Sequence, residues 1–99
     1  MKIFAFILFS LSLAFAKKQK KCRALVLQGG GDRGAYQAGA IKAFVNALPA
    51  EQRNWQVVSG ISIGAMNAFG VGQFPPDQDE DMADLLYYFW EKIAPQKLF

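Results

Sequence analysis

Ser62 is the residue of this chain whose surroundings best suit a nucleophile. It lies in Gly60-Ile61-Ser62-Ile63-Gly64, a Gly-x-Ser-x-Gly pattern that follows the apolar run 55–58 and precedes small residues suited to a helix. In this pattern a strand ends, the chain turns sharply on the serine, and a helix leaves. Gly60 and Gly64 would leave room where larger side chains would collide with strand and helix. The pattern predicts an exposed hydroxyl at a sheet edge, near the positive end of a helix.

A second glycine-rich turn, Gly29-Gly30-Gly31-Asp32-Arg33-Gly34, follows the apolar run 24–27. Ester hydrolysis builds negative charge on the carbonyl oxygen, and main-chain N–H groups aimed at that oxygen lower the barrier. Glycines let such groups approach without a side chain in the way, and a following helix adds its positive end. One turn with donors beside another with a nucleophile would form a hydrolase site, although either turn alone is also compatible with a purely structural role.

The same glycines allow a different interpretation. Gly29-x-Gly31-x-x-Gly34 fits the fingerprint of a dinucleotide-binding fold, and Glu51 lies about twenty residues further on, at the spacing of the ribose-binding acid. That acid belongs at the end of the second strand, however, whereas Glu51 precedes the strand and Ser59-Gly60 occupies its place. A nucleotide-binding fragment is therefore kept as the alternative to a hydrolase.

Composition excludes several kinds of site. The 99 residues contain no histidine, which excludes a Ser-His-Asp triad and a histidine-rich metal site among them. The single cysteine, Cys22, permits no internal disulfide, and we expect a buried thiol at the start of a strand. The net charge is +3 with 11 Lys/Arg, and the basic residues cluster only within 17–23, so a nucleic-acid partner is not supported. Nothing in the sequence requires a metal or a cofactor.

Residues 1–16 have the pattern of a signal peptide. Lys2 gives a positive start, residues 3–13 are almost wholly apolar, and Ala14-Phe15-Ala16 offers small residues to a signal peptidase. The apolar run is shorter than the ~20 residues that span a bilayer, which makes a retained membrane anchor the alternative. We predict cleavage near Ala16 and a secreted or lumenal protein with a basic leader over 17–23.

Strands and helices alternate over residues 24–99. The run 24–27 is typical of a strand buried on both faces, and a second strand over 55–58 leads to the serine, which a short or interrupted helix follows. A helix is expected over 35–48, ended by Pro49, with Gly39 packed closely against a sheet. Its expected apolar face consists of Tyr36, Ala40, Ile41, Phe44, Val45 and Leu48.

The last expected element is an amphipathic helix over 82–93, preceded by the acidic residues 79–81. The order of elements predicts an α/β layered fold with a mostly parallel sheet and flanking helices. A right-handed crossover places both glycine-rich turns at one edge of that sheet. A sheet of two strands is too small to cover the apolar faces of the expected helices. Residues 24–99 are therefore expected to form the N-terminal portion of a larger domain.

Together, the two turns resemble the patatin-like phospholipases. The resemblance covers about residues 24–69 and is carried by Leu25-Val26-Leu27-Gln28-Gly29-Gly30-Gly31-Asp32-Arg33-Gly34 and Ser59-Gly60-Ile61-Ser62-Ile63-Gly64-Ala65-Met66-Asn67-Ala68. It implies a lipid acyl hydrolase that cleaves glycerolipids or phospholipids at a membrane or micelle surface through a Ser-Asp dyad. Ser62 would be the nucleophile, and Arg33 would match the loop arginine of the family. The oxyanion-hole segment would comprise Gly29, Gly30, Gly31, Asp32, Arg33 and Gly34.

The family's catalytic aspartate lies in a downstream Asp-Gly-Gly or Asp-Gly-Ala motif, which does not occur in residues 1–99. The aspartates present are Asp32, Asp77, Asp79, Asp81 and Asp84. The last four belong to a loop and a helix start, where acids are normally solvated caps. Because a serine without a base is a poor nucleophile, little activity is expected from these residues alone. A further alternative is a secreted, catalytically dead module whose helix 82–93 binds lipid or a partner.

Overall fold

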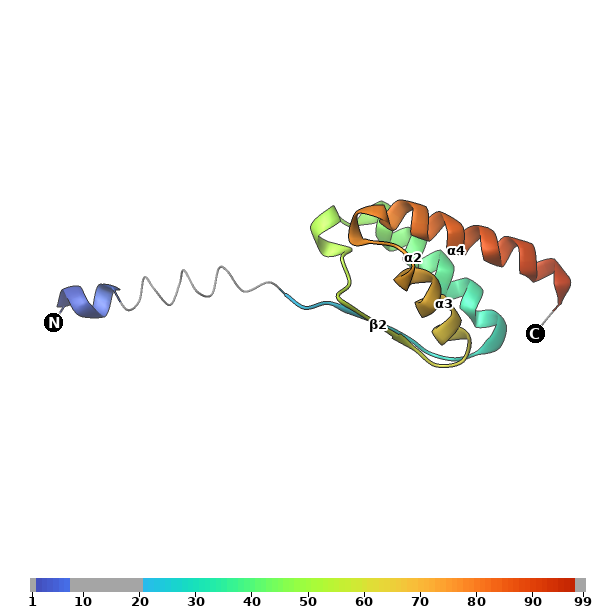
Figure 1. The fold of residues 1–99 in the computed structure, drawn as a ribbon, viewed down its shortest axis with the longest axis horizontal. Helices are drawn as coiled ribbons and strands as arrows, with labels where there is room; N and C mark the ends of the chain where they lie inside the picture. The colour runs from blue at the N-terminus through green and yellow to red at the C-terminus, as the bar shows by residue number, and fades with distance from the viewer. Residues whose placement is uncertain (1, 8–20, 98–99) are drawn as a thin grey trace.

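The computed structural model describes residues 2–7 and 21–97. Two strands form the sheet, and Figure 1 shows the long helices after residue 33 on one side of it. Most of the predicted signal peptide, including its cleavage site, lies outside the described residues. Its residues 2–7 are described and form a helix. No helix in the described part of the chain is both long and apolar enough to cross a membrane.

The sheet pairs β1 (Ala24–Leu27) with β2 (Val57–Gly60) in parallel. Ala24 lies opposite Val57 and Leu27 opposite Gly60, so both strands end at the same edge of the sheet. The second strand begins two residues later than the sequence predicted. Just before it, the Gln56 side chain accepts a hydrogen bond from the Arg23 amide (2.7 Å).

The three helices follow the predicted order. They are α2 (Gly34–Ala47), α3 (Ile63–Gly72) and α4 (Asp79–Ile93). Short 3-10 helices precede or follow them: η1 (Gly31–Arg33), η2 (Ala50–Gln52), η3 (Pro76–Gln78) and η4 (Ala94–Gln96). The α3 helix contacts both strands, whereas α2 and α4 pack on each other and on α3. The α/β architecture with a parallel sheet is therefore confirmed.

Four expectations about burial were wrong. Val26 is 73% exposed because no described element covers that face of the sheet, so β1 is buried on one face only. Of the expected apolar face of α2, Tyr36 and Phe44 are 82% and 47% exposed, since the buried face is formed by Ala38, Ile41 and Val45. A side-chain carbon on Gly39 would meet no atom within 4 Å. Cys22, ahead of β1, is exposed.

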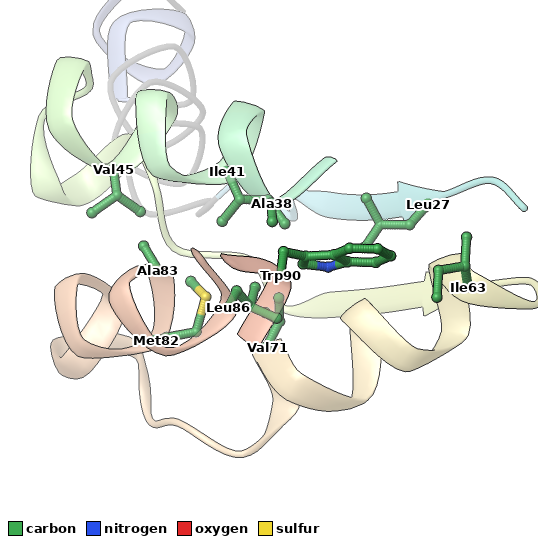
Figure 2. Close-up of a cluster of buried hydrophobic side chains, with 10 residues drawn as sticks. All are labelled: Leu27, Ala38, Ile41, Val45, Ile63, Val71, Met82, Ala83, Leu86 and Trp90. Atoms are coloured by element: carbon green, nitrogen blue, oxygen red, sulfur yellow. The ribbon is translucent and has the colours of Figure 1, made fainter. Parts of the chain in front are cut away.

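The hydrophobic core lies between α2, α3, α4 and one face of the sheet. Figure 2 shows the indole ring of Trp90 near the centre of the buried group, between residues of α2 and the pair Leu27 and Ile63. The buried hydrophobic residues are Leu27, Ala38, Ile41, Val45, Ile63, Val71, Met82, Ala83, Leu86 and Trp90. This core therefore fixes the helix that follows Ser62 against the ends of both strands.

An ion pair joins the segment before β2 to the start of α4, at the end of the fold opposite to Ser62. Arg53, in the connection to β2, contacts Asp79 at the start of α4 through its Nε atom (2.5 Å), and both side chains are largely buried. Arg53 also donates through Nη1 to the carbonyl oxygen of Val45 in α2. One guanidinium group thus joins α2, α4 and the segment before β2.

Candidate active site

Ser62 stands at a sharp turn between β2 and α3. It is exposed, and its backbone has φ 56° and ψ −123°, a positive-φ conformation that is strained for a residue with a side chain. The turn is held by the Ile61 amide, which donates to the Leu27 carbonyl (3.1 Å), and by the amides of Ala65 and Met66, which donate to the Ser62 carbonyl. The observed geometry is that of a strand-turn-helix with an accessible serine at its tip.

The two glycines around Ser62 are required by close backbone packing. A Cβ on Gly60 would clash with the carbonyl group of Gly64 and come within 2.6 Å of the Ala65 nitrogen. A Cβ on Gly64 would clash with the Leu27 carbonyl and lie 2.6 Å from the Gln28 oxygen. The start of α3 therefore rests directly on the backbone of β1, which brings the serine turn to the end of the first strand.

The glycine loop lies beside the serine turn. A Cβ placed on Gly29 would be 3.3 Å from the Cβ of Ser62 and 3.4 Å from the carbonyl oxygen of Ile61. Gly30 and Gly31 have φ 148° and φ 58°, conformations that L side chains rarely adopt. The structure therefore places the two glycine-rich turns next to each other.

The amides of the loop divide into two groups. Within the described residues, the N–H groups of Gly29, Gly30 and Gly31 donate no hydrogen bond to the backbone or to a side chain. The Arg33 amide donates to the Gly30 carbonyl (3.2 Å), and the Gly34 amide donates to carbonyls of η1. Arg33 and Gly34 thus use their amides locally. The Asp32 amide, like those of Gly29, Gly30 and Gly31, donates no hydrogen bond within the described residues, so these four amides are the available donors.

Gly34 has a packing role instead. A Cβ there would clash with the indole ring of Trp90 and lie 2.6 Å from the side chain of Ile63. Gly34, the third glycine of the Gly-x-Gly-x-x-Gly pattern, thus leaves the space that the Trp90 ring occupies in the core. Glu51, the acid of the nucleotide alternative, lies in η2, before β2 rather than at its end.

Two aspartates of α4 form ion pairs with basic residues of other segments. Asp79 pairs with Arg53 at the opposite end of β2, and Asp84 pairs with Lys42 on the surface (3.1 Å). Asp77 lies in η3 and Asp81 in the first turn of α4. In the part of the chain that the structure describes, no group of three or more His, Cys, Asp or Glu side chains could hold a metal ion.

An apolar groove lies between α3 and α4, with a cavity volume of about 540 Å³. It begins at Ala65 and Met66, within about one helical turn of Ser62, and no charged residue lines it. The lining residues are Ala65, Met66, Asn67, Phe69, Gly70, Gln73, Leu85, Leu86 and Phe89. A second cavity, of about 380 Å³, lies beside Arg53 and Asp79 at the far end of β2 and α3.

Asn67 was assigned no role from the sequence. It is 1% exposed, and among the described residues it is the one buried polar side chain. The signal in the sequence was an amide side chain inside the almost wholly apolar segment 63–72. Its partners, on α2 and α4, could be found only in the folded chain.

The chain matches one known protein family over most of its length. Residues 25–98 match the model of the patatin-like phospholipase family, which is three quarters of the chain and extends well beyond the two turns. Comparisons with the curated proteins and with the solved structures give no match. The chain therefore belongs to the patatin-like phospholipase family.

Proposed function

We propose that this protein is a serine-dependent lipid acyl hydrolase in which Ser62 is the nucleophile. The observation that carries the proposal is an exposed serine at a positive-φ turn, adjacent to a loop whose glycine amides lack an acceptor among the described residues. Amides that are free in the resting protein can bind an oxygen whose charge develops during the reaction, without first breaking other bonds. The family supplies the lipid ester as the substrate class.

The reaction begins with attack of the Ser62 hydroxyl oxygen on the ester carbonyl carbon, while a base takes the hydroxyl proton. The carbonyl oxygen becomes negative and is stabilised by N–H groups of the segment Gly29–Asp32. The tetrahedral intermediate collapses, the alcohol leaves with the proton from the base, and an acyl-serine remains. Water then attacks this ester with the help of the same base and releases the fatty acid and the free serine.

We propose that the base is a carboxylate from outside residues 1–99, as in the Ser-Asp dyad that the family resemblance implies. Asp79 is paired with Arg53, at the opposite end of β2 from Ser62, and Asp84 is paired with Lys42 of α2, and no contact of either carboxylate with Ser62 is found among the described residues. Loss of a member of the known triads costs several powers of ten in rate, about 10⁴ or more. The 99 residues alone are therefore expected to react slowly with esters.

We propose that the apolar groove between α3 and α4 binds the acyl chain of the substrate. It starts close to Ser62, and its lining lacks charged groups, so it favours a hydrocarbon chain over a head group. Each CH₂ group that leaves water contributes about 0.8 kcal/mol, which gives a long acyl chain a clear preference for such a groove.

We also propose that residues 1–16 direct the protein to the secretory pathway and are removed near Ala16. The supporting observation is the order of a positive residue, an apolar run and small residues at the N-terminus. N-terminal sequencing of the protein recovered from a secreting host would give Lys17 as the first residue. Recovery of protein that retains Met1 in the membrane fraction would favour an uncleaved anchor.

The proposed nucleophile is tested with a fluorophosphonate probe, which reacts covalently with activated serines. The wild-type chain is expected to incorporate the probe slowly at one site, and Ser62→Ala should incorporate none. Ser59→Ala is the matched control, because Ser59 is also exposed and lies three residues away, within β2 rather than at the turn. Equal labelling of wild type and Ser62→Ala would exclude Ser62 as the nucleophile.

A lipid-binding module without catalysis remains a second candidate. The observation that favours it is the number of large apolar or aromatic side chains exposed on α4: Leu85, Tyr87, Tyr88 and Phe89. Binding to phosphatidylcholine vesicles that is equal in wild type and Ser62→Ala, with no probe incorporation by either, would support this candidate over the hydrolase.

A further inference from the structure

A chain of side-chain amides connects the core to the glycine loop. Trp90 of α4 donates through Nε1 to the Oδ1 atom of Asn67 (2.9 Å). Asn67 of α3 donates through Nδ2 to the Gly34 carbonyl and to the Oε1 atom of Gln37, both at 3.0 Å. Gln37 of α2 in turn donates through Nε2 to the carbonyl of Gln28 (2.7 Å). The chain thus runs from α4 through α3 and α2 to the end of β1.

The donor and acceptor types fix the direction of every link. An indole N–H can only donate, so the Asn67 oxygen faces Trp90 and its NH₂ group faces α2. The Gln37 oxygen then accepts, which leaves its own NH₂ group for the Gln28 carbonyl. A reversed Asn67 amide would place its NH₂ group against the indole N–H and its oxygen against two other oxygens. Because Asn67 is buried, these unsatisfied groups would cost too much free energy for the reversed orientation to be populated.

The last link controls a peptide group of the candidate site. The Gln28 carbonyl belongs to the same planar, trans peptide as the Gly29 N–H, so the two groups point in opposite directions. Gln37 holds the carbonyl, and this fixes where the Gly29 amide points. The α3 helix, which begins directly after Ser62, is held by the same chain through Asn67. The Gln37 and Asn67 side chains thus hold the glycine loop and the serine turn in a fixed relative position.

We propose that Gln37 and Asn67 are positioning residues of the active site, which orient the Gly29 amide relative to Ser62; this inference rests on the proposed function. Neither residue touches the ester. Gln37 is only half-buried and Gln28 is exposed, so their hydrogen bond adds little to global stability. Its effect is local, because it restrains a glycine-rich segment that has few other side-chain contacts.

The test uses Gln37→Glu and Gln37→Met in the full chain. The glutamate keeps an acceptor for Asn67 but turns an oxygen toward the Gln28 carbonyl, and the methionine removes both hydrogen bonds. Gln56→Met is the matched control: Gln56 also makes an exposed bond, in which its Oε1 atom accepts from the Arg23 amide (2.7 Å), at the opposite end of the sheet from the two turns. Gln37 variants are chosen over Asn67 variants because loss of a buried amide affects folding itself.

Two readouts are compared. The first is amide hydrogen exchange at Arg33, whose N–H is bonded to the Gly30 carbonyl, and the second is the rate of fluorophosphonate incorporation at Ser62. Both Gln37 variants should speed the exchange at Arg33 and slow the labelling roughly tenfold, the equivalent of one hydrogen bond. Gln56→Met should change neither, and all three should unfold within a few degrees of wild type.

Unchanged exchange and unchanged labelling in both Gln37 variants would overturn the inference, even if labelling of the wild type and not of Ser62→Ala upholds the proposed function. Absence of labelling in the wild type would instead defeat the proposed function. The exchange rate at Arg33 would then decide alone whether Gln37 orders the loop.

Discussion

Gly64 rests against the Leu27 carbonyl so closely that a single methyl group at position 64 could not be accommodated. The obstructing atoms belong to the backbone, which cannot rotate away as a side chain would. The contact joins the helix after Ser62 to the end of β1, and the glycine loop continues from there. The distance between the serine turn and the loop therefore depends on the absence of one side chain.

Gly64→Ala is expected to destabilise the fold by about 1–3 kcal/mol or more, because it forces strand and helix apart. It should also abolish labelling of Ser62. Gly39→Ala is the control, since a Cβ there meets nothing within 4 Å in the interior of α2. This second change should stabilise the protein by roughly 0.5–1 kcal/mol. Urea unfolding of both variants gives the comparison, and equal stabilities would contradict the packing argument.

Ser62→Gly separates backbone strain from chemistry. A glycine adopts φ 56° readily, so this variant should gain about 1 kcal/mol of stability over wild type while losing the nucleophile. Ser62→Ala loses the same hydroxyl but keeps the strain, and its stability should stay near that of wild type. Thermal unfolding of the two variants measures the difference. A glycine variant no more stable than the alanine variant would show that the turn stores no strain.

The sequence predicted the two turns well because their requirements are local. A strand, a glycine, a serine and a helix within 57–72 determine one turn, and a strand followed by three glycines determines the other. The parallel pairing of β1 and β2 follows from the helix between them. These features need no knowledge of distant contacts.

The face of α2 that the sequence predicted to be buried was only partly right, because Ile41 and Val45 are buried whereas Tyr36 and Phe44 are exposed. The segment 34–47 is apolar nearly all round, and Tyr36 and Phe44 have the spacing of a core face as much as Ala38, Ile41 and Val45 do. The choice is made by α4, because Trp90 needs the space beside Gly34. Asn67 was missed for the same reason, since its partners Gly34 and Trp90 lie 33 and 23 residues away.

Trp90→Phe tests how strongly the buried amide depends on its donor. The change leaves the Asn67 oxygen without the indole N–H and opens a small space in the core, and about 2–3 kcal/mol of stability should be lost. Trp55→Phe is the control: Trp55 is also partly buried against the core, and none of the hydrogen bonds found among the described residues involves its indole N–H. It should cost about 1 kcal/mol. Chemical denaturation of both variants should show the larger loss at Trp90.

Asp79→Asn should be much more damaging than Asp84→Asn, although each removes one carboxylate from an ion pair. The Asp79 side chain is 12% exposed and that of Arg53 is 17% exposed, so the change leaves a largely buried guanidinium without its closest charged partner. A loss of about 3 kcal/mol is expected. The Asp84 side chain is 70% exposed, and its loss should cost less than about 1 kcal/mol. Similar stabilities of the two variants would show that Glu80, 3.8 Å from Arg53, takes over the pairing.

The acyl-chain groove is tested with Phe69→Gln and a fluorescent fatty acid, cis-parinaric acid, as the probe. Phe69 lines the groove on the outer side of α3 and is largely exposed, so its replacement should change stability by less than about 0.5 kcal/mol. Binding of the probe should weaken roughly tenfold, because part of a phenyl group's contribution of about 1.5–3 kcal/mol is lost. Tyr36→Gln is the control, since it removes an equally exposed aromatic ring from α2, outside the groove. Equal weakening by both changes would mean that the probe binds exposed aromatic surface in general. That result would contradict the proposal that the groove binds an acyl chain.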